Sequence, residues 1–212
     1  MRRELAPLLR GVRSLRADGV EFFELETAAV AIGGIGRIAA CRATEAVIAK
    51  YAPSVIVSAG IAGALSLALK VGDVVQAREV VDADSGARFT ASGGESIVAT
   101  VSSVSGQSDK RMLADRWNAD VVDMEAAAVA AVAHRSEIEL MVIKAISDEL
   151  DFQMPPVGRF VNGSGTFETL RFAGYVAVRP KWWKAVRQLN SNSRVASANL
   201  SEALDHLIDQ RS

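Results

Sequence analysis

The sequence predicts an α/β protein in which a mixed central β-sheet is flanked by helices. Residues 140–148, LMVIKAISD, form an apolar run that is typical of a buried strand. Residues 121–133, VVDMEAAAVAAVA, indicate a short strand followed by a helix that is small and apolar on nearly all sides. Residues 54–65 contain another buried strand, which is interrupted by Gly60 and Gly63. Strands mixed with helical segments in this way indicate a sheet covered by helices.

The remaining elements follow from local patterns along the chain. Before residue 120 we expect a helix (1–15), paired strands (21–33), a glycine-rich turn into a helix (34–50), a strand (71–81), a polar loop (82–94), a strand (96–104) and a short helix (109–117). After residue 148 we expect an irregular proline-containing segment (149–160), two helices (166–178 and 181–189) split at Pro180, and a closing amphipathic helix (196–208). A chain of 212 residues is expected to form one domain over residues 1–212.

Composition narrows the classes of function. The formal net charge is −1, so nothing indicates nucleic acid or another polyanion as a partner. Cys41 is the only cysteine, which excludes an internal disulfide and fits a reducing cytoplasm. The two histidines, His134 and His206, cannot by themselves build a metal site or a Ser-His-Asp triad. Neither a signal-peptide pattern nor a membrane-spanning apolar run is found, so we expect a soluble cytoplasmic enzyme or binder without a metal.

Two acids stand where the helix of residues 121–133 begins. Asp123 suits an N-cap, because its carboxylate can accept from the unpaired N–H groups of the first turn. Glu125 falls in that turn, where the helix dipole favours an anion. The two positions are about 200° apart around a helix, so the acids cannot share one task. They are either two capping carboxylates or part of a functional site.

A further acid, Asp148, ends the apolar strand of residues 140–148, directly after Ser147. Ligands of α/β sheets bind at the carboxyl ends of strands. Asp148 is therefore a candidate acid or base, and the plain alternative is a capping or salt-bridged aspartate.

The turn Gly34-Ile-Gly36-Arg-Ile-Ala39 fits the dinucleotide fingerprint G-x-G-x-x-A. That fingerprint needs an acid at the end of the next strand to bind the ribose hydroxyls. The next strand, residues 54–57, is followed by Ser58-Ala59-Gly60 and carries no acid. A nicotinamide cofactor is therefore disfavoured, and we expect no cofactor.

The motifs GGIGR, SAGIAGALSLALKVGDVV, DMEAAA and KAISD occur together and in this order. In this, the sequence resembles the purine nucleoside phosphorylase and nucleosidase superfamily over most of residues 1–150, and it is most similar to the methylthioadenosine/S-adenosylhomocysteine nucleosidase type. The resemblance implies a three-layer fold, a nucleoside substrate and a homodimer. In that family a glycine-ending strand precedes the first helix, and the pattern Met-x-x-Glu follows the strand. Met1 and Glu4 match the pattern but the strand is absent, so either it has been lost or the start lies upstream, and we favour the second.

The resemblance also implies roles for individual side chains. Asp148 matches the aspartate that donates a proton to N7 of the purine. Glu125 matches the glutamate that accepts from the ribose hydroxyls, and Met124 the methionine that packs on the ribose. Ser147 flanks the acid. Lys144 stands where the family usually has arginine, so its role stays open.

Other positions indicate whether the nucleophile is water or phosphate. In nucleosidases a glutamate at the position of Glu4 activates water. Phosphorylases instead bind phosphate with an arginine and a serine or threonine, where this chain has Ser58 and Ile61. A buried phosphate needs positive charge, although Arg37 or Arg88 could supply it from elsewhere. We therefore predict hydrolysis, with phosphorolysis and a non-catalytic nucleoside binder as alternatives.

The glycine-containing turn at residues 60–63 is expected to contact the substrate. Gly60, Ile61 and Gly63 lie where the strand of residues 54–65 breaks, and glycine lets the backbone approach a small ligand.

The last third of the chain departs from the small-molecule nucleosidases. SDELDFQMPP followed by RPKWWKAVRQLNSNSR resembles the hopanoid-associated phosphorylases, whose substrate is a lipid-linked adenosine. Phe172, Tyr175, Trp182 and Trp183 then line an apolar groove or a dimer contact. Ordinary core or interface packing is the alternative for these aromatic residues.

Overall fold

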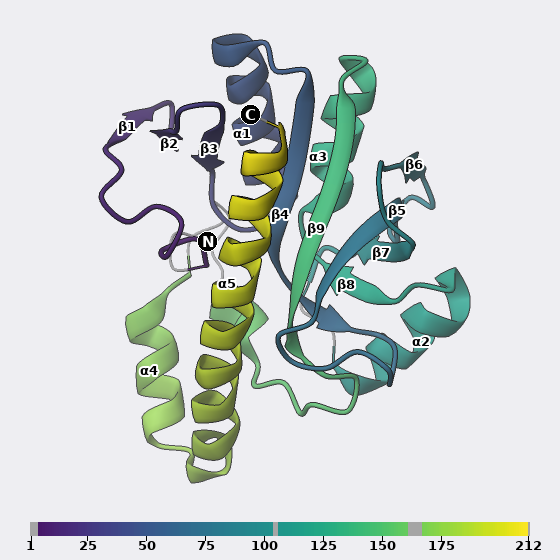
Figure 1. Ribbon diagram of the computed structural model, residues 1–212. Coiled ribbons are helices and arrows are strands. Elements are labelled where there is room, and N and C mark those ends of the chain that lie inside the picture. Colours follow the sequence, from purple (N-terminus) through teal and green to yellow (C-terminus); the bar gives the residue numbers. More distant parts are fainter. Residues whose placement is uncertain (1–3, 104–105, 161–166, 212) are drawn as a thin grey trace.

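The computed structural model describes residues 4–103, 106–160 and 167–211, and Figure 1 shows the arrangement of its elements. A separate antiparallel sheet comes first, with strand order β1-β2-β3. Its strands are β1 (Ser14–Ala17), β2 (Val20–Glu24) and β3 (Ala29–Ile32). The predicted paired strands of residues 21–33 are thus confirmed, but they lie outside the central sheet.

The central sheet has the strand order β6-β5-β7-β8-β4-β9 and mixes parallel and antiparallel pairs. Its strands are β4 (Val55–Ala64), β5 (Val74–Asp82), β6 (Arg88–Thr90), β7 (Ser96–Thr100), β8 (Val121–Asp123) and β9 (Glu139–Asp148). Because β5 also pairs with β9, the strands from β5 round to β9 close on one another like a small barrel.

Helices cover this sheet on different sides (Figure 1). They are α1 (Arg37–Tyr51), α2 (Gln107–Trp117), α3 (Ala126–Arg135), α4 (Thr169–Ala177) and α5 (Trp183–Arg211), with the 3₁₀ turns η1 (Val157–Phe160) and η2 (Pro180–Trp182). The α3 helix packs against α1 and the sheet, and α5 lies along β9 and β4. Five of the six alanines of α3 are buried, which lets the helix approach the strands closely. The prediction of a mixed sheet flanked by helices is confirmed.

The core lies between β9 and the helices on either side of it. Ala127, Ala130, Val142 and Ile146 are buried in the cluster on the α3 side. On the other side, Leu200 of α5 packs in a cluster with Ile143 and Ala145 of β9. Because β9 is covered on both faces, its sequence is a continuous apolar run rather than an alternating one.

Three local predictions need correction. Residues 4–11 form turns rather than a helix; Gly11 has a φ of 81°, and Leu5 and Leu9 are held by packing against α5. The helices expected at 181–189 and 196–208 are one helix, α5, because the polar stretch between them does not break it. The loop expected at residues 82–94 contains the short strand β6.

Candidate active site

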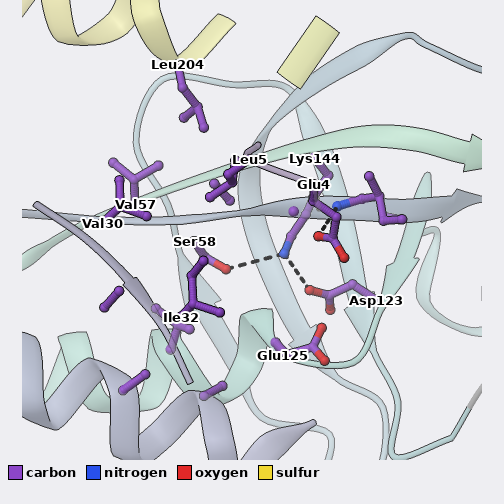
Figure 2. A pocket seen from close by; sticks show the side chains of 18 of the residues that line it. Glu4, Leu5, Val30, Ile32, Val57, Ser58, Asp123, Glu125, Lys144 and Leu204 are labelled. Carbon is purple, nitrogen blue, oxygen red and sulfur yellow. Dashed lines mark hydrogen bonds and ion pairs between the residues drawn. The ribbon is translucent and has the colours of Figure 1, made fainter. Parts of the chain in front are cut away.

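A cavity of about 1750 Å³ lies where β4, β8 and β9 meet β3, α5 and the N-terminal turns. Figure 2 shows part of it, with side chains from these elements facing a common space. Its polar lining comes from distant parts of the sequence and includes Glu4, Ser58, Lys110, Asp123, Glu125, Lys144, Ser147 and Asp148. The cavity therefore contains every acid that the sequence singled out as a candidate for chemistry.

Strand pairing explains how these residues come together. The parallel pairing of β4 with β9 sets Lys144 opposite Gly60 and Asp148 opposite Gly63. Asp148 thus ends β9 beside the glycine-containing part of β4, at the carboxyl end of a strand as the sequence indicated.

Glu125 precedes α3 and its carboxylate lies in the cavity (Figure 2). The backbone N–H of Gly36 donates to Glu125 Oε1 at 2.7 Å. Gly36 has a φ of 89°, a backbone conformation that would be strained for any residue with a side chain. Burial is the main reason that the pKa of the Glu125 carboxyl is raised, and the charge of Asp123 adds to the shift, while Lys144 and the Gly36 N–H oppose it. Glu125 is therefore held in place by the glycine-rich turn rather than by its own helix.

Asp123 is buried and fully engaged within the protein. Its Oδ2 lies 2.7 Å from Lys144 Nζ and accepts from the Ala126 N–H at 2.9 Å, while its Oδ1 accepts from Thr100 Oγ1 at 2.7 Å. Asp123 does accept from the first turn of α3, as predicted, but it ends β8, and Glu125 is the residue at the N-cap position.

Lys144 is a buried cation next to Asp123, with only 2% of its surface exposed. Besides its pair with Asp123, its Nζ donates to Ser58 Oγ at 3.4 Å (Figure 2). A buried lysine requires a partner, so a single charged residue within an apolar strand was a usable signal in the sequence. That signal did not reveal which acid it pairs with.

Glu4 enters the same cavity from the N-terminal turns. Its Oε2 accepts from the backbone N–H of Ile61 at 3.4 Å. A Cβ atom built on Gly60 would lie 3.6 Å from Glu4 Oε2 and 3.8 Å from Lys144 Nζ. Glu4 and Lys144 therefore both lie beside Gly60, and Glu4 lines the cavity with the other acids rather than standing on an exposed helix.

Asp148 is 3% exposed, and both of its carboxylate oxygens are engaged. Lys110 Nζ lies 2.5 Å from Oδ2, and the Ser147 hydroxyl donates to Oδ1 at 2.7 Å. Lys110, on α2, was missed from the sequence, because one lysine on a polar helix carries no local sign of being buried.

Other predicted residues fall inside or outside the cavity. Met124, Gly60, Ile61 and Gly63 line it, as does Phe167. The two arginines considered for phosphate do not: Arg37 pairs with Asp82 at 2.7 Å, and Arg88 pairs with Glu79. The aromatic residues Phe172, Tyr175, Trp182 and Trp183 are also outside the lining.

The described residues have two further properties. They contain no group of three or more His, Cys, Asp or Glu side chains that could hold a metal ion. In the same part of the chain, no helix is long and apolar enough to cross a membrane.

The sequence model described as the Phosphorylase superfamily matches residues 11–103 and 94–164, and the chain belongs to this superfamily. Its curated relatives include 5'-methylthioadenosine/S-adenosylhomocysteine nucleosidases. The protein of Shewanella halifaxensis is 29% identical over 197 residues, covering 73% of this chain and 86% of the relative. That of Tolumonas auensis is 26% identical over 188 residues, covering 69% and 81%. That of Actinobacillus succinogenes is 29% identical over 152 residues, and the match spans 56% of this chain and only 66% of the relative.

Solved structures share the fold. The 5'-methylthioadenosine/S-adenosyl homocysteine nucleosidase of Helicobacter pylori has a TM-score of 0.75 at 20% identity, covering 99% of this chain and 95% of that one. The 5'-methylthioadenosine nucleosidase of Arabidopsis thaliana has a TM-score of 0.76 at 19% identity, covering 99% and 91%. Futalosine hydrolase of Helicobacter pylori has a TM-score of 0.69 at 19% identity, covering 97% and 94%. The comparisons bear out the predicted fold and the prediction of a nucleosidase-type enzyme.

The raised pKa of Glu125 predicts a pH-dependent effect of Glu125→Gln on stability. The folded protein holds the Glu125 proton more tightly than the unfolded chain does, so wild type loses stability as pH rises from the ordinary value of 4.5 through the folded pKa. Glutamine has no such proton and still accepts from Gly36. The melting temperature of the variant relative to wild type should therefore be higher at pH 7 than at pH 4, as measured by calorimetry.

The matched control is Glu202→Gln, on the exposed side of α5. It should show no such difference between the two pH values. An equal effect of Glu125→Gln at pH 4 and pH 7 would contradict the buried environment described for Glu125.

Proposed function

We propose that this protein hydrolyses the N-glycosidic bond of an adenine nucleoside and releases the purine base. The observation that carries the proposal is that Glu4, Glu125 and Asp148 line one cavity although they come from different elements. Cleaving this bond needs a proton for the leaving base, stabilisation of a cationic sugar and an activated nucleophile. Each of these tasks falls to one of the three acids.

Asp148 is assigned to the protonation of the leaving purine. Its carboxyl group delivers a proton to N7, which lets the adenine leave as a neutral molecule while the bond from C1′ to N9 breaks. Ser147 orients the carboxylate through its hydrogen bond to Oδ1. Gly63, opposite Asp148 in the sheet, lets the acid lie close to β4, since a Cβ at Gly63 would be only 2.9 Å from Asp148 Oδ2.

Glu125 and Met124 are assigned to the sugar. A carboxylate at Glu125 accepts from the ribose hydroxyls and is attracted to the positive charge that develops on the sugar in the transition state. The neighbouring Asp123 adds to the negative potential, since it raises the pKa of Glu125 through its charge. Met124 packs against the ribose.

Glu4 is assigned to the water. Its carboxylate takes a proton from the water molecule as the water oxygen bonds to C1′. Gly60 and Ile61 hold it beside the sugar site, because the Ile61 N–H donates to Glu4. The same contacts weigh against phosphorolysis. The Ser58 hydroxyl accepts a hydrogen bond from Lys144, and the Ile61 N–H donates to Glu4, so both groups are engaged within the protein rather than with a phosphate. The reaction needs no cofactor.

The 5′ substituent of the substrate is assigned to the part of the cavity that apolar side chains line. Val30, Ile32, Val57 and Leu204 face this space (Figure 2). An apolar 5′ substituent would be removed from water there, and the names of the curated relatives suggest methylthioadenosine and S-adenosylhomocysteine as the first substrates to test. A lipid-linked adenosine, as in the hopanoid-associated branch, is the extended form of the same proposal. The exposed Trp183 lies outside the cavity and supports neither form.

The assay is release of adenine from methylthioadenosine, S-adenosylhomocysteine and adenosine, with and without phosphate. We expect adenine and an unphosphorylated sugar product to be released at the same rate with and without phosphate. Glu4→Gln should lower kcat on the order of 10²–10⁴-fold, the usual contribution of a general base. Glu45→Gln, which changes an exposed glutamate paired with Arg135, is the matched control and should leave kcat unchanged.

Three outcomes contradict the proposal in different ways. Turnover only with phosphate, giving a ribose 1-phosphate product, would establish the phosphorylase alternative. Nucleoside binding without adenine release would establish a non-catalytic binder. Full activity of Glu4→Gln would remove Glu4 from the chemistry.

We further propose that residues 1–212 act as one domain and that two copies form a cytoplasmic homodimer. The single free thiol of Cys41 suits a reducing compartment. Exposed apolar side chains on α4 and α5, Leu170 at 89% and Trp183 at 53%, are available for an interface. Light scattering should give the mass of a dimer, and Leu170→Glu should lower it towards that of the monomer. A monomeric mass for wild type at working concentration would contradict the assembly.

A further inference from the structure

The residues at the N-cap positions of α1 and α3 contact each other. Gly36 is the N-cap residue of α1, and Glu125 is that of α3. The Gly36 N–H donates to Glu125 Oε1 at 2.7 Å, and the two helices pack against each other. The place where each helix begins therefore determines whether the carboxylate assigned to the ribose receives this hydrogen bond.

The edge of the central sheet fixes the start of α3. Three parallel strands end there in register, with Asp82 of β5 opposite Thr100 of β7, and Thr100 opposite Asp123 of β8. Asp123 Oδ2 accepts from the Ala126 N–H at 2.9 Å, and Thr100 Oγ1 accepts from the Ala127 N–H at 2.9 Å. Both N–H groups belong to the first turn of α3. Two of the three side chains at this edge thus hold the helix that follows Glu125.

Asp82, the third side chain at this edge, holds the start of α1. Arg37 is the first residue of α1, and it donates from Nη1 to Asp82 Oδ2 at 2.8 Å and from Nη2 to Oδ1 at 2.7 Å. A bidentate pair fixes orientation as well as distance. The hydrogen bonds from Arg37 are the main reason that the pKa of the Asp82 carboxyl is lowered to about 2, so Asp82 stays ionised at neutral pH.

We propose that the Arg37–Asp82 ion pair positions Gly36 so that its N–H orients the Glu125 carboxylate for the ribose. The inference rests on the proposed function, because it concerns the glutamate assigned to the sugar. Arg37 directly follows Gly36 in the chain, so anchoring the arginine to the sheet restricts the glycine. Neither Arg37 nor Asp82 lines the cavity. Both act through Gly36 and are positioning residues.

The charges around Glu125 make this role distinguishable from a simple electrostatic one. Burial, Asp123 of β8 and Glu4 of the N-terminal turns raise the pKa of Glu125, whereas Lys144 of β9 and the Gly36 N–H lower it. Loss of the Gly36 hydrogen bond should therefore raise this pKa further.

Positioning predicts such a rise whichever member of the pair is removed. A direct effect of charge has opposite signs for the two members, since losing the cation Arg37 raises a carboxyl pKa and losing the anion Asp82 lowers it. The direction of the two shifts therefore separates positioning from electrostatics.

The first experiment titrates the Glu125 carboxyl by carbon-13 NMR in wild type, Arg37→Met, Asp82→Asn and the double variant, with Glu125→Gln to assign the signal. Asparagine keeps the size of Asp82 but replaces one acceptor with an amide donor. We expect the pKa of Glu125 to rise in both single variants. The double variant has the net charge of wild type and should show a rise of similar size rather than the sum, because all three variants break one ion pair.

The second experiment measures kcat and KM for adenine release by the same variants. We expect KM to rise and kcat/KM to fall on the order of 10²-fold, since a misplacement of about 1 Å can cost that much. A merely structural role would lower the fraction of folded enzyme and leave KM unchanged. Arg88→Met is the matched control, because it removes an exposed arginine paired with Glu79 on the same strand as Asp82. It should keep the wild-type KM and the wild-type pKa of Glu125.

Several results would overturn the inference. These are opposite shifts of the Glu125 pKa in the two single variants, an unchanged pKa in both, or a wild-type KM in both. Thermal melting monitored by circular dichroism verifies folding, and if Asp82→Asn does not fold, the double variant decides, since an unchanged pKa there overturns the inference. If wild type releases adenine from no nucleoside, the proposed function fails, whereas the NMR titration still decides whether the Arg37–Asp82 pair positions Gly36.

Discussion

The parallel pairing of β4 with β9 is the constraint on which the site depends. It sets Gly60 against Lys144 and Gly63 against Asp148, so that positions without side chains on one strand face charged side chains on the next. A Cβ at Gly63 would lie only 2.9 Å from Asp148 Oδ2 and 3.1 Å from Lys110 Nζ, whereas a Cβ at Gly60 would make ordinary contacts with Glu4 and Lys144. The sheet therefore does more than support the site, because its register determines which charges meet.

Burying charged groups is costly, and the cavity offsets the cost by pairing them. Lys144 is paired with Asp123, and Lys110 is paired with Asp148. Removing one member of such a pair leaves an uncompensated buried charge, which typically costs about 3–5 kcal/mol. Glu125 accepts from the Gly36 N–H, yet its pKa is raised by burial and by the charge of Asp123. Such an excess of negative charge suits a site in which the reacting sugar becomes a cation.

Much of the fold could be predicted from the sequence, because periodicity and burial are local signals. The apolar run before Asp148 predicted the end of a buried strand, and the alanine-rich stretch after Glu125 predicted the start of a helix. Both acids do line one cavity. Two features were missed: that the last two predicted helices form the single helix α5, and that β2 and β3 pair with β1 in a sheet separate from the central one. Both depend on packing between distant segments, and short polar stretches or strand patterns do not encode it.

The pairing of charges was the least predictable part of the site. Nothing local distinguishes Lys110 from the exposed Arg111 beside it; only the position of α2 against the end of β9 separates them. Likewise, Asp123 and Glu125 looked like two caps of one helix. In the structure Asp123 is the partner of Lys144, and Glu125 is held by a turn 89 residues earlier in the chain.

The central claim is that the acids of this cavity surround one nucleoside. A crystal structure of the protein with an adenine nucleoside analogue whose glycosidic bond cannot be hydrolysed tests it most directly. We expect the purine N7 at hydrogen-bond distance, about 3 Å, from the Asp148 carboxylate, and the ribose hydroxyls donating to Glu125. Glu4 should lie on the face of C1′ opposite the purine. An analogue bound with its base away from Asp148, or outside the cavity, would contradict the account.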